Sequence, residues 1–458
     1  MGEMEVPADA LYGASTQRAV LNFPISGQRF PRPFIRALAL IKQAAAETNA
    51  ELGLVEGAVG AAIAAAAADV AGGAHDEQFP IDIYQTGSGT STNTNMNEVV
   101  AHLATARLAA DGGATRVHPN DDVNKCQSSN DVIPTALQVA AAMTIDTSLV
   151  PALEILRVAL DAKADELWPI VKTGRTHLQD ATPIRLGQEF RGYAGQVEES
   201  IRRARAAEAE LLVVPLGGTA VGTGINAHPD YAAGACRRLA ALTGLEVRET
   251  ANHFHAQASL DVAIAAHGAL RTIALSLWKI GNDLRLMGMG PRAGLAEIAL
   301  PETQPGSSIM PGKVNPVIIE SLTMVVARVL GNDTTVAFGQ TGSFLELNVM
   351  LPVTAAALLE SIALLAAAAR NFADRAVSGV TATNRGPALV EAGLMLATAL
   401  APEIGYDAAA ALAKEALKTG RTIRDLATER GIAVGRLDEL LDPASMTQPG
   451  LGSGPAGG

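Results

Sequence analysis

The chain has 458 residues, enough for two or three domains, and it is 48% hydrophobic but only 3% aromatic. Its formal net charge is -12, which argues against nucleic acid or an anionic membrane surface as the main partner, because both need clustered Lys and Arg. Two cysteines without a CxxC pair and no recognisable secretory leader predict a cytoplasmic protein.

Apolar periodicity predicts a mainly helical chain after an irregular arm over residues 1–35. Alanine supplies much of the hydrophobic content, and it favours helices that approach one another closely. The expected helices cover 35–51, 55–70, 95–110, 148–165, 184–212, 231–243, 256–287, 316–340, 349–373, 406–419 and 422–430, and one more begins near Val132. Long helices joined at their ends predict an up-and-down bundle, and their Ala-rich faces predict packing between subunits.

The segment 57–68 is the most apolar stretch that we recognise in the sequence. It is shorter than the roughly 20 residues that a bilayer-spanning helix needs. We therefore expect no membrane span.

Four polar blocks interrupt the helices and are expected to be loops at helix ends: 86–97, 118–131, 174–183 and 306–320. The first is rich in Gly, Ser, Thr and Asn, which suits close backbone approach and hydroxyl donation to a carboxylate. The second places Ser128, Ser129 and Asn130 where a helix offers free N–H groups. The alternative is that one of these residues, or Asp131, is only an N-cap.

The fourth block opens with Gly306-Ser307-Ser308-Ile309-Met310-Pro311-Gly312-Lys313-Val314-Asn315-Pro316. It is not a phosphate-binding P-loop, because five residues, instead of the four of that motif, separate Gly306 from the Gly312-Lys313 pair. The next residue, Val314, also lacks the hydroxyl that binds magnesium. The sequence also lacks a dinucleotide fingerprint, a GxSxG elbow and an HExxH pair. We therefore expect neither a cofactor nor a metal.

Together the four blocks offer hydroxyls, amides, one lysine, one histidine and helix N-termini. This set suits a small carboxylate and proton abstraction beside it, in which the intermediate gains negative charge. Ser307 is a base only if Lys313 and loop N–H groups activate it strongly. His177 is the natural acid–base group near neutral pH. Glu320 orients His177 or a water, or is only a favourable first-turn carboxylate, and Asn315 is alternatively an N-cap.

The segment GSSIMPGKVNP resembles the signature of the fumarase/aspartase superfamily. Six further segments are similar to class II fumarases in the same order: 6–20, 86–99, 118–132, 174–189, 217–226 and 404–416. The resemblance, which covers essentially the whole chain, implies a mainly α, three-domain fold whose central bundle of long helices forms a twenty-helix core in a homotetramer. We place the N-terminal domain at 1–128, the long-helix bundle at 129–352 and a small helical domain at 353–458.

The resemblance also implies an activity, the reversible anti hydration of fumarate to (S)-malate through a carbanion (aci-carboxylate), without a cofactor. It implies active sites built from loops of three subunits. Ser307 would be the base, His177 paired with Glu320 would act on the water, and Lys313 would help to hold the dianion. The carboxylate-binding residues would be Ser88, Thr90, Ser128, Ser129, Asn130, Thr176 and Asn315, together with Lys313.

A secondary dicarboxylate site of the family would map onto His118, Asn120 and Asp121. The arginine usual in that site is absent, because Thr115 stands at the matching position, with Arg116 beside it.

The main alternative function is aspartate ammonia-lyase, which shares the fold and the signature loop. Aspartases usually carry threonine where this chain has Ser129, so the Ser-Ser-Asn order favours fumarase. A crystallin-like structural protein that lost its activity is another alternative. The presence of Ser307, His177, Lys313 and Asn315 together argues against it.

Overall fold

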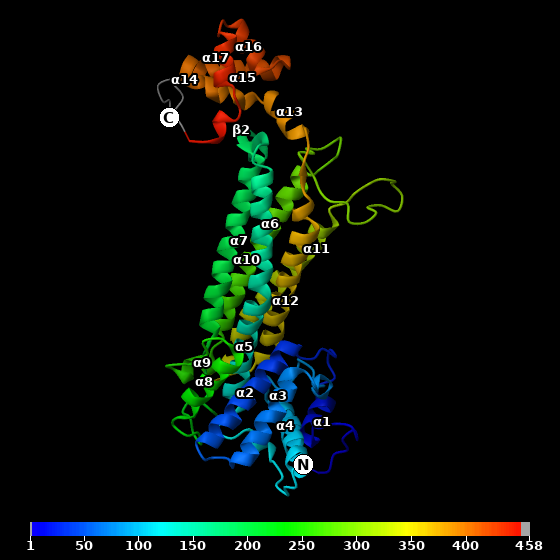
Figure 1. The fold of residues 1–458 in the computed structure, drawn as a ribbon, viewed down its shortest axis with the longest axis vertical. Helices are drawn as coiled ribbons and strands as arrows, with labels where there is room; N and C mark the ends of the chain where they lie inside the picture. The colour runs from blue at the N-terminus through cyan, green and yellow to red at the C-terminus, as the bar shows by residue number, and fades with distance from the viewer. Residues whose placement is uncertain (1, 450–458) are drawn as a thin grey trace. The chain divides into compact units, whose positions relative to one another are not determined.

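The computed structural model describes residues 2–449, and these residues are mainly helical, as the sequence predicts (Figure 1). They form two compact units. Within the described chain, unit 1 comprises residues 2–151, 200–274 and 325–367, and unit 2 comprises residues 152–199, 275–324 and 368–449. The three-domain division at residues 128 and 352 stays a prediction, and its residues 450–458 lie outside the described chain.

Unit 1 is built around α2 (Arg32–Glu51), which packs against α3 (Gly57–Gly72), α5 (Ser129–Thr144) and α8 (Tyr231–Thr243). In Figure 1, α2, α3 and α4 lie side by side. The other elements of this unit are α1 (Ala14–Asn22), η1 (Asp76–Gln78), α4 (Thr90–Ala110), η2 (Pro119–Val123), η3 (Ile145–Leu149), β3 (Val213–Val214), β4 (Arg248–Glu249), α9 (His253–Ala258), η4 (Gln340–Gly342), β6 (Ser343–Phe344) and β7 (Leu347–Asn348). Strands β3 and β4 are parallel, and β6 and β7 are antiparallel.

Unit 2 carries an antiparallel hairpin, β1 (Val171–Thr176) with β2 (Gln179–Arg185), and a second antiparallel pair, β5 (Ile298–Ala299) with β8 (Thr381–Ala382). Its C-terminal elements are η5 (Val377–Gly379), α13 (Arg385–Glu391), η6 (Leu394–Leu400), α14 (Ala401–Ile404), α15 (Tyr406–Thr419), α16 (Ile423–Glu429), α17 (Val434–Leu440) and η7 (Ser445–Thr447). Leu400, Leu412 and Leu437 are fully buried in the core that these last helices share.

Five long helices contribute residues to both units: α6 (Val150–Glu166), α7 (Leu186–Leu211), α10 (Asp261–Met287), α11 (Val317–Gly339) and α12 (Leu351–Arg375). Most of the helices predicted from the sequence match the observed helices within a few residues at each end. The apolar stripe of α6 shows why, since Leu153, Leu156 and Leu160 recur at helical spacing and all three are fully buried.

Three of the polar blocks differ from the predicted loops. The block 118–131 contains the π-helical turn η2, and α5 begins within it at Ser129. Helix α4 begins at Thr90, five residues before the predicted start at 95, so most of the block 86–97 is helical. Its Asn93, Asn95 and Asn97 are buried rather than exposed in a loop. The block 174–183 is not a loop between two helices. Its residues form most of a β-hairpin, in which β1 and β2 pair antiparallel across a tight turn.

The apolar stretch 57–68 lies within α3, a helix too short to cross a membrane, as the sequence predicts. Within the described residues, Ser129–Glu166 and Leu351–Gly379 are long and apolar enough to cross a membrane, with mean hydropathies of 1.5 and 1.9. More than half of each apolar window, 56% and 61%, is buried inside the chain. Burial against other helices accounts for that apolar character without a bilayer.

Candidate active site

The N-terminus of α5 contains three of the predicted binding residues. Ser128 is its N-cap: Oγ of Ser128 accepts from the N–H of Asn130 at 3.3 Å, and the N–H of Ser128 donates to Asp131 Oδ1 at 2.9 Å. Ser128 and Asp131 thus form a capping box, in which Ser128 is the N-cap and Asp131 is the third helical residue. The side chains of Ser129 and Asn130 take no part in that box.

Asp131 connects this helix end to the glycine-rich turn near residue 217. Its buried carboxylate accepts from the N–H groups of Gly217 and Thr219 at 2.9 and 3.0 Å. Burial raises the pKa of the Asp131 carboxyl, and its three N–H donors act against that rise. The Asn130 amide donates to Ala220 O at 2.9 Å, so the binding segment is attached to the turn at two points.

The buried ammonium group of Lys42 is connected to Ser129 through the side chains of Asn124 and Asn93. Lys42 of α2 donates to Asn124 Oδ1 at 3.0 Å and to Gln127 Oε1 at 2.9 Å. The Asn93 amide donates to Asn124 Oδ1 and to Ser129 Oγ, both at 3.2 Å. Burial lowers the pKa of Lys42 from its ordinary 10.5 to about 7, and the charge of Asp131 opposes this shift. Lys42 is not among the residues predicted from the sequence, although a lysine among the apolar residues of a helix indicates a buried charge.

The start of α4 adjoins the start of α5. Gly89 has φ 71°, and a Cβ there would lie 2.7 Å from Ile133 Cγ2, so only glycine fits. On either side of it, Ser88 Oγ and Thr90 Oγ1 are hydrogen-bonded at 2.8 Å. Unit 1 thus brings two helix N-termini and several hydroxyls together, which is an arrangement suited to an anion.

The hairpin of unit 2 carries Thr176 and His177. Thr176 pairs with Gln179, which leaves His177 and Leu178 as the two turn residues, with φ 57° and 60°. Such a turn favours Asn and Gly, so a His-Leu turn is conformationally costly, and strain of this kind concentrates at functional sites. Thr176 and His177 are exposed, and in residues 2–449 no hydrogen bond to either side chain is present.

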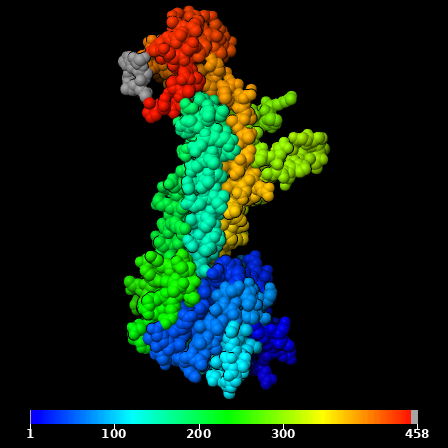
Figure 2. Space-filling view, viewed as in Figure 1, coloured from blue at the N-terminus to red at the C-terminus, as the bar shows by residue number. Residues whose placement is uncertain are grey.

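The signature loop, residues 306–316, is held by hydrogen bonds between its own residues. Oγ of Ser307 accepts from the N–H groups of Ile309 and Met310 at 3.2 and 2.9 Å. The Asn315 amide donates to Gly306 O across the loop, so Asn315 serves the loop rather than capping the next helix. Figure 2 shows the segment between α10 and α11 standing out from the surface, and Ile309 is 83% exposed.

The predicted residues thus divide into two sets. Ser88, Thr90 and 128–130 belong to unit 1, whereas Thr176, His177 and the signature loop belong to unit 2. Lys313 and Glu320 are exposed. Among the described residues of unit 2, no hydrogen bond or ion pair joins His177 to Glu320, or Lys313 to Ser307.

The predicted secondary site lies on the exposed π-helical turn η2. Nδ1 of His118 accepts from the N–H of Asp121 at 3.1 Å, and Asp121 Oδ2 lies at the same distance. Asn120 is exposed in the same turn. Across the described residues, no group of three or more His, Cys, Asp or Glu is arranged to hold a metal ion.

Comparison with known proteins shows the family to which the chain is similar. A family model described as Lyase matches residues 2–331, and one described as Fumarase C C-terminus matches residues 396–448. Fumarate hydratase class II of Mycobacterium tuberculosis is 52% identical over 455 residues, which cover 98% of this chain and 95% of that relative. The chain belongs to the class II fumarate hydratase family.

Solved structures agree with the family assignment. A class II fumarase of Schistosoma mansoni has a TM-score of 0.93 at 37% identity and covers 97% of both chains. A fumarate lyase:delta crystallin of Brucella melitensis bound to cobalt has a TM-score of 0.94 at 44% identity and covers 98% of both chains. The predicted family and mainly α fold are confirmed.

Proposed function

We propose that the chain is a fumarate hydratase that interconverts fumarate and (S)-malate by anti addition and elimination of water. The observation that carries this proposal is the 52% identity, over 98% of the chain, to a fumarate hydratase class II. The two adjoining helix N-termini of unit 1 support it, because they suit a carboxylate.

In the dehydration direction, Ser307 removes a proton from the malate carbon next to one carboxylate. The electron pair moves into that carboxylate and forms the aci-carboxylate dianion. The hydroxyl on the neighbouring carbon then leaves with a proton as water, and the C=C bond of fumarate forms. The N–H groups of Ile309 and Met310, which donate to Ser307 Oγ, would stabilise charge on the deprotonated oxygen.

The other groups divide the remaining work. His177, paired with Glu320, acts on the water, and Lys313 and Asn315 stabilise the dianion. Ser88, Thr90, Ser128, Ser129, Asn130 and Thr176 hold the carboxylates. His118, Asn120 and Asp121 form a second dicarboxylate site.

We propose a homotetramer in which each active site takes loops from three subunits. The signature loop, which stands out from the surface of its own unit, supports this arrangement (Figure 2). Exposed apolar side chains on α10 and α11 supply faces for the subunit core: Leu275, Trp278, Met324 and Phe338. In this proposal the protein is cytoplasmic, has three domains and binds neither membrane nor nucleic acid.

The direct test follows the absorbance of fumarate with malate and, separately, with aspartate as substrate. Formation of fumarate from malate but not from aspartate is the expected result. Formation from aspartate alone would replace the proposal by an ammonia-lyase activity, and inactivity with both would defeat it.

A mixing experiment tests the shared site. Mixed tetramers of His177→Asn and Ser129→Ala subunits should regain activity, because some sites then receive only intact loops. Recovery is measured after joint dissociation and reassociation, with each variant treated alone as the control. Mixed tetramers that stay inactive would contradict the shared site.

A further inference from the structure

We infer that Lys172, Arg175, Glu189 and Glu297 are positioning residues that hold the histidine-bearing hairpin in its reactive place. We name these four residues the hairpin cluster. The inference rests on the proposed function, since it assigns the cluster its role through His177.

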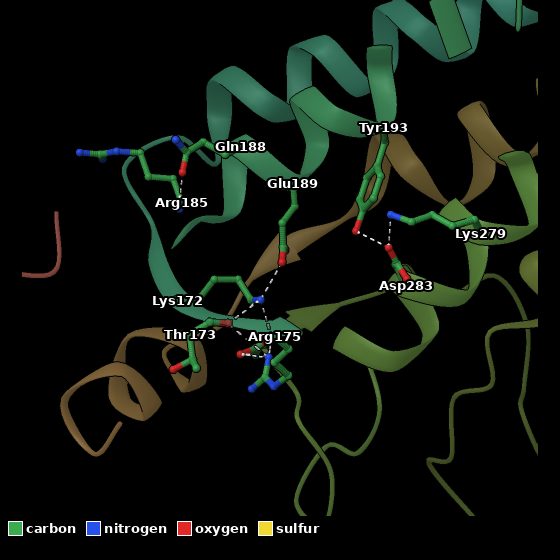
Figure 3. A network of polar contacts seen from close by, with 10 residues as sticks. Lys172, Thr173, Arg175, Arg185, Gln188, Glu189, Tyr193, Lys279 and Asp283 are labelled. Atoms are coloured by element: carbon green, nitrogen blue, oxygen red, sulfur yellow. Dashed lines mark hydrogen bonds and ion pairs between the residues drawn. The ribbon is translucent and has the colours of Figure 1, made fainter. Parts of the chain in front are cut away.

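The hairpin cluster is a closed set of two cations and two carboxylates in unit 2. The ammonium of Lys172 donates to Glu189 Oε1 at 2.9 Å (Figure 3). The same ammonium lies 3.2 Å from Glu297 Oε2. Nη1 of Arg175 lies 3.0 Å from both carboxylate oxygens of Glu297. Lys172 and Glu297 are almost fully buried, with side chains 2% and 1% exposed. The two cations and the two carboxylates are equal in formal charge.

The cluster connects three parts of the chain. Lys172 and Arg175 belong to β1, Glu189 to the first turn of α7, and Glu297 precedes β5. The main-chain oxygen of Glu297 also accepts from the N–H of Thr383 at 3.0 Å, so this carboxylate sits on a fixed backbone. The hairpin is thereby held against both the long helix and the segment that leads towards the signature loop.

His177 has no anchor of its own in residues 2–449, so its position depends on the backbone of the hairpin. Arg175, two residues before it, is the nearest residue held by a buried charge. Between the two ends of the hairpin the register is interrupted at Gly174, where a Cβ would lie 2.6 Å from Thr182 O. A bulge increases the local twist of a strand and redirects its tip. Lys172 and Arg175 of the cluster lie on either side of this bulge, so the cluster holds the hairpin where the bulge redirects its tip.

Stability alone is a poor reason for such a cluster. Buried ion pairs are costly to desolvate, and well-packed apolar residues are often at least as stabilising. One oxygen of Glu189, Oε2, has no partner although it is buried, so part of that cost is not recovered. What charge-assisted hydrogen bonds add over apolar packing is direction, especially from the rigid fork of an arginine.

A second polar group on α7 provides the comparison. The hydroxyl of Tyr193 donates to Asp283 Oδ2 at 3.1 Å, and Lys279 lies over the Tyr193 ring (Figure 3). This group joins α7 to α10 without touching the hairpin. Tyr193→Phe is thus a matched control, since it removes one buried hydrogen bond on the same helix.

The test uses the double variant Lys172→Met/Glu189→Leu, which removes one cation and one carboxylate together. The full-length protein should fold with an unchanged oligomeric mass, while kcat for fumarate hydration falls about 100-fold, the effect expected of a displacement near 1 Å. KM should change by less than about threefold, because the carboxylate-binding residues are untouched. Tyr193→Phe should keep the wild-type kcat.

The second variant, Arg175→Lys, keeps the charge but not the fork, so it tests the inference even if the double variant fails to fold. We expect kcat to fall about tenfold with little change in KM. Wild-type kcat in a folded double variant or in Arg175→Lys would overturn the inference, because the cluster would then only stabilise the fold. An equal loss of kcat in Tyr193→Phe would overturn it as well. An inactive wild-type protein, by contrast, defeats the proposed function itself.

Discussion

The buried Lys42 makes the stability of this protein depend on pH in a direction that can be worked out. Burial lowers the pKa of Lys42 from 10.5 to about 7 in the folded chain. Between these two pH values the unfolded chain binds a proton that the folded chain does not, so stability rises with pH. Below about pH 7 both states hold the proton, and above 10.5 neither does, so the slope is confined to this window.

The pKa of Lys42 in the folded chain, about 7, is thus about 3.5 below its ordinary 10.5. At about 1.4 kcal/mol per unit this difference is worth about 5 kcal/mol in total, of which about 3 kcal/mol falls between about pH 7 and about pH 9.5. The variant Lys42→Met has no proton to exchange at this position and should lack the slope. The free energy of unfolding of the wild type should therefore rise relative to that of Lys42→Met as pH increases.

The assay is denaturant unfolding of both proteins across that pH range, at one fixed protein concentration because an oligomer unfolds in a concentration-dependent way. Lys418→Met, which replaces an exposed lysine on α15, is the matched control and should follow the wild type. Parallel curves for wild type and Lys42→Met would refute the reasoning, since they would mean that the ammonium keeps its ordinary pKa in the folded chain.

Three further predictions concern single residues. Ser307→Ala should lower kcat by about 10²- to 10⁴-fold, the range expected for a lost general base, with an unchanged oligomeric mass; steady-state kinetics check this, and a near-normal kcat would remove Ser307 from that role. Gly174→Ala places a methyl 2.6 Å from Thr182 O, so the hairpin must shift; kcat should fall about tenfold while KM changes little, and an unchanged kcat would contradict this. Burial, with a smaller effect of a nearby carboxylate, raises the pKa of the Cys236 thiol to about 12. Alkylation of Cys236 followed by mass spectrometry should therefore be about 10³-fold slower in the folded protein than in the unfolded one, and equal rates would contradict its burial.

Much of the candidate site could be predicted because its residues stand in short, local patterns. The polar block before α5 made Ser128, Ser129 and Asn130 candidates and raised an N-cap as the alternative, and the structure shows that Ser128 is that N-cap. The role of Asp131 was only partly predicted. Oδ2 of Asp131 accepts hydrogen bonds from the N–H groups of Gly217 and Thr219, more than 80 residues away in the sequence. No pattern of neighbouring residues predicts that contact.

The sequence by itself determined the helical class, the approximate bounds of the helices, the family and the polar blocks. Amphipathic spacing and signature motifs are properties of neighbouring residues, so they can be read without the fold.

The tertiary structure alone decided that α4 begins at Thr90, that residues 174–183 form a hairpin, and that Lys42 and Glu297 are buried. A buried charge is tolerated only where its partners arrive from elsewhere in the chain. Lys42 meets Asn124 across 82 positions, and Arg175 meets Glu297 across 122. Such pairs depend on how the helices and strands pack, which residue spacing along the chain does not encode.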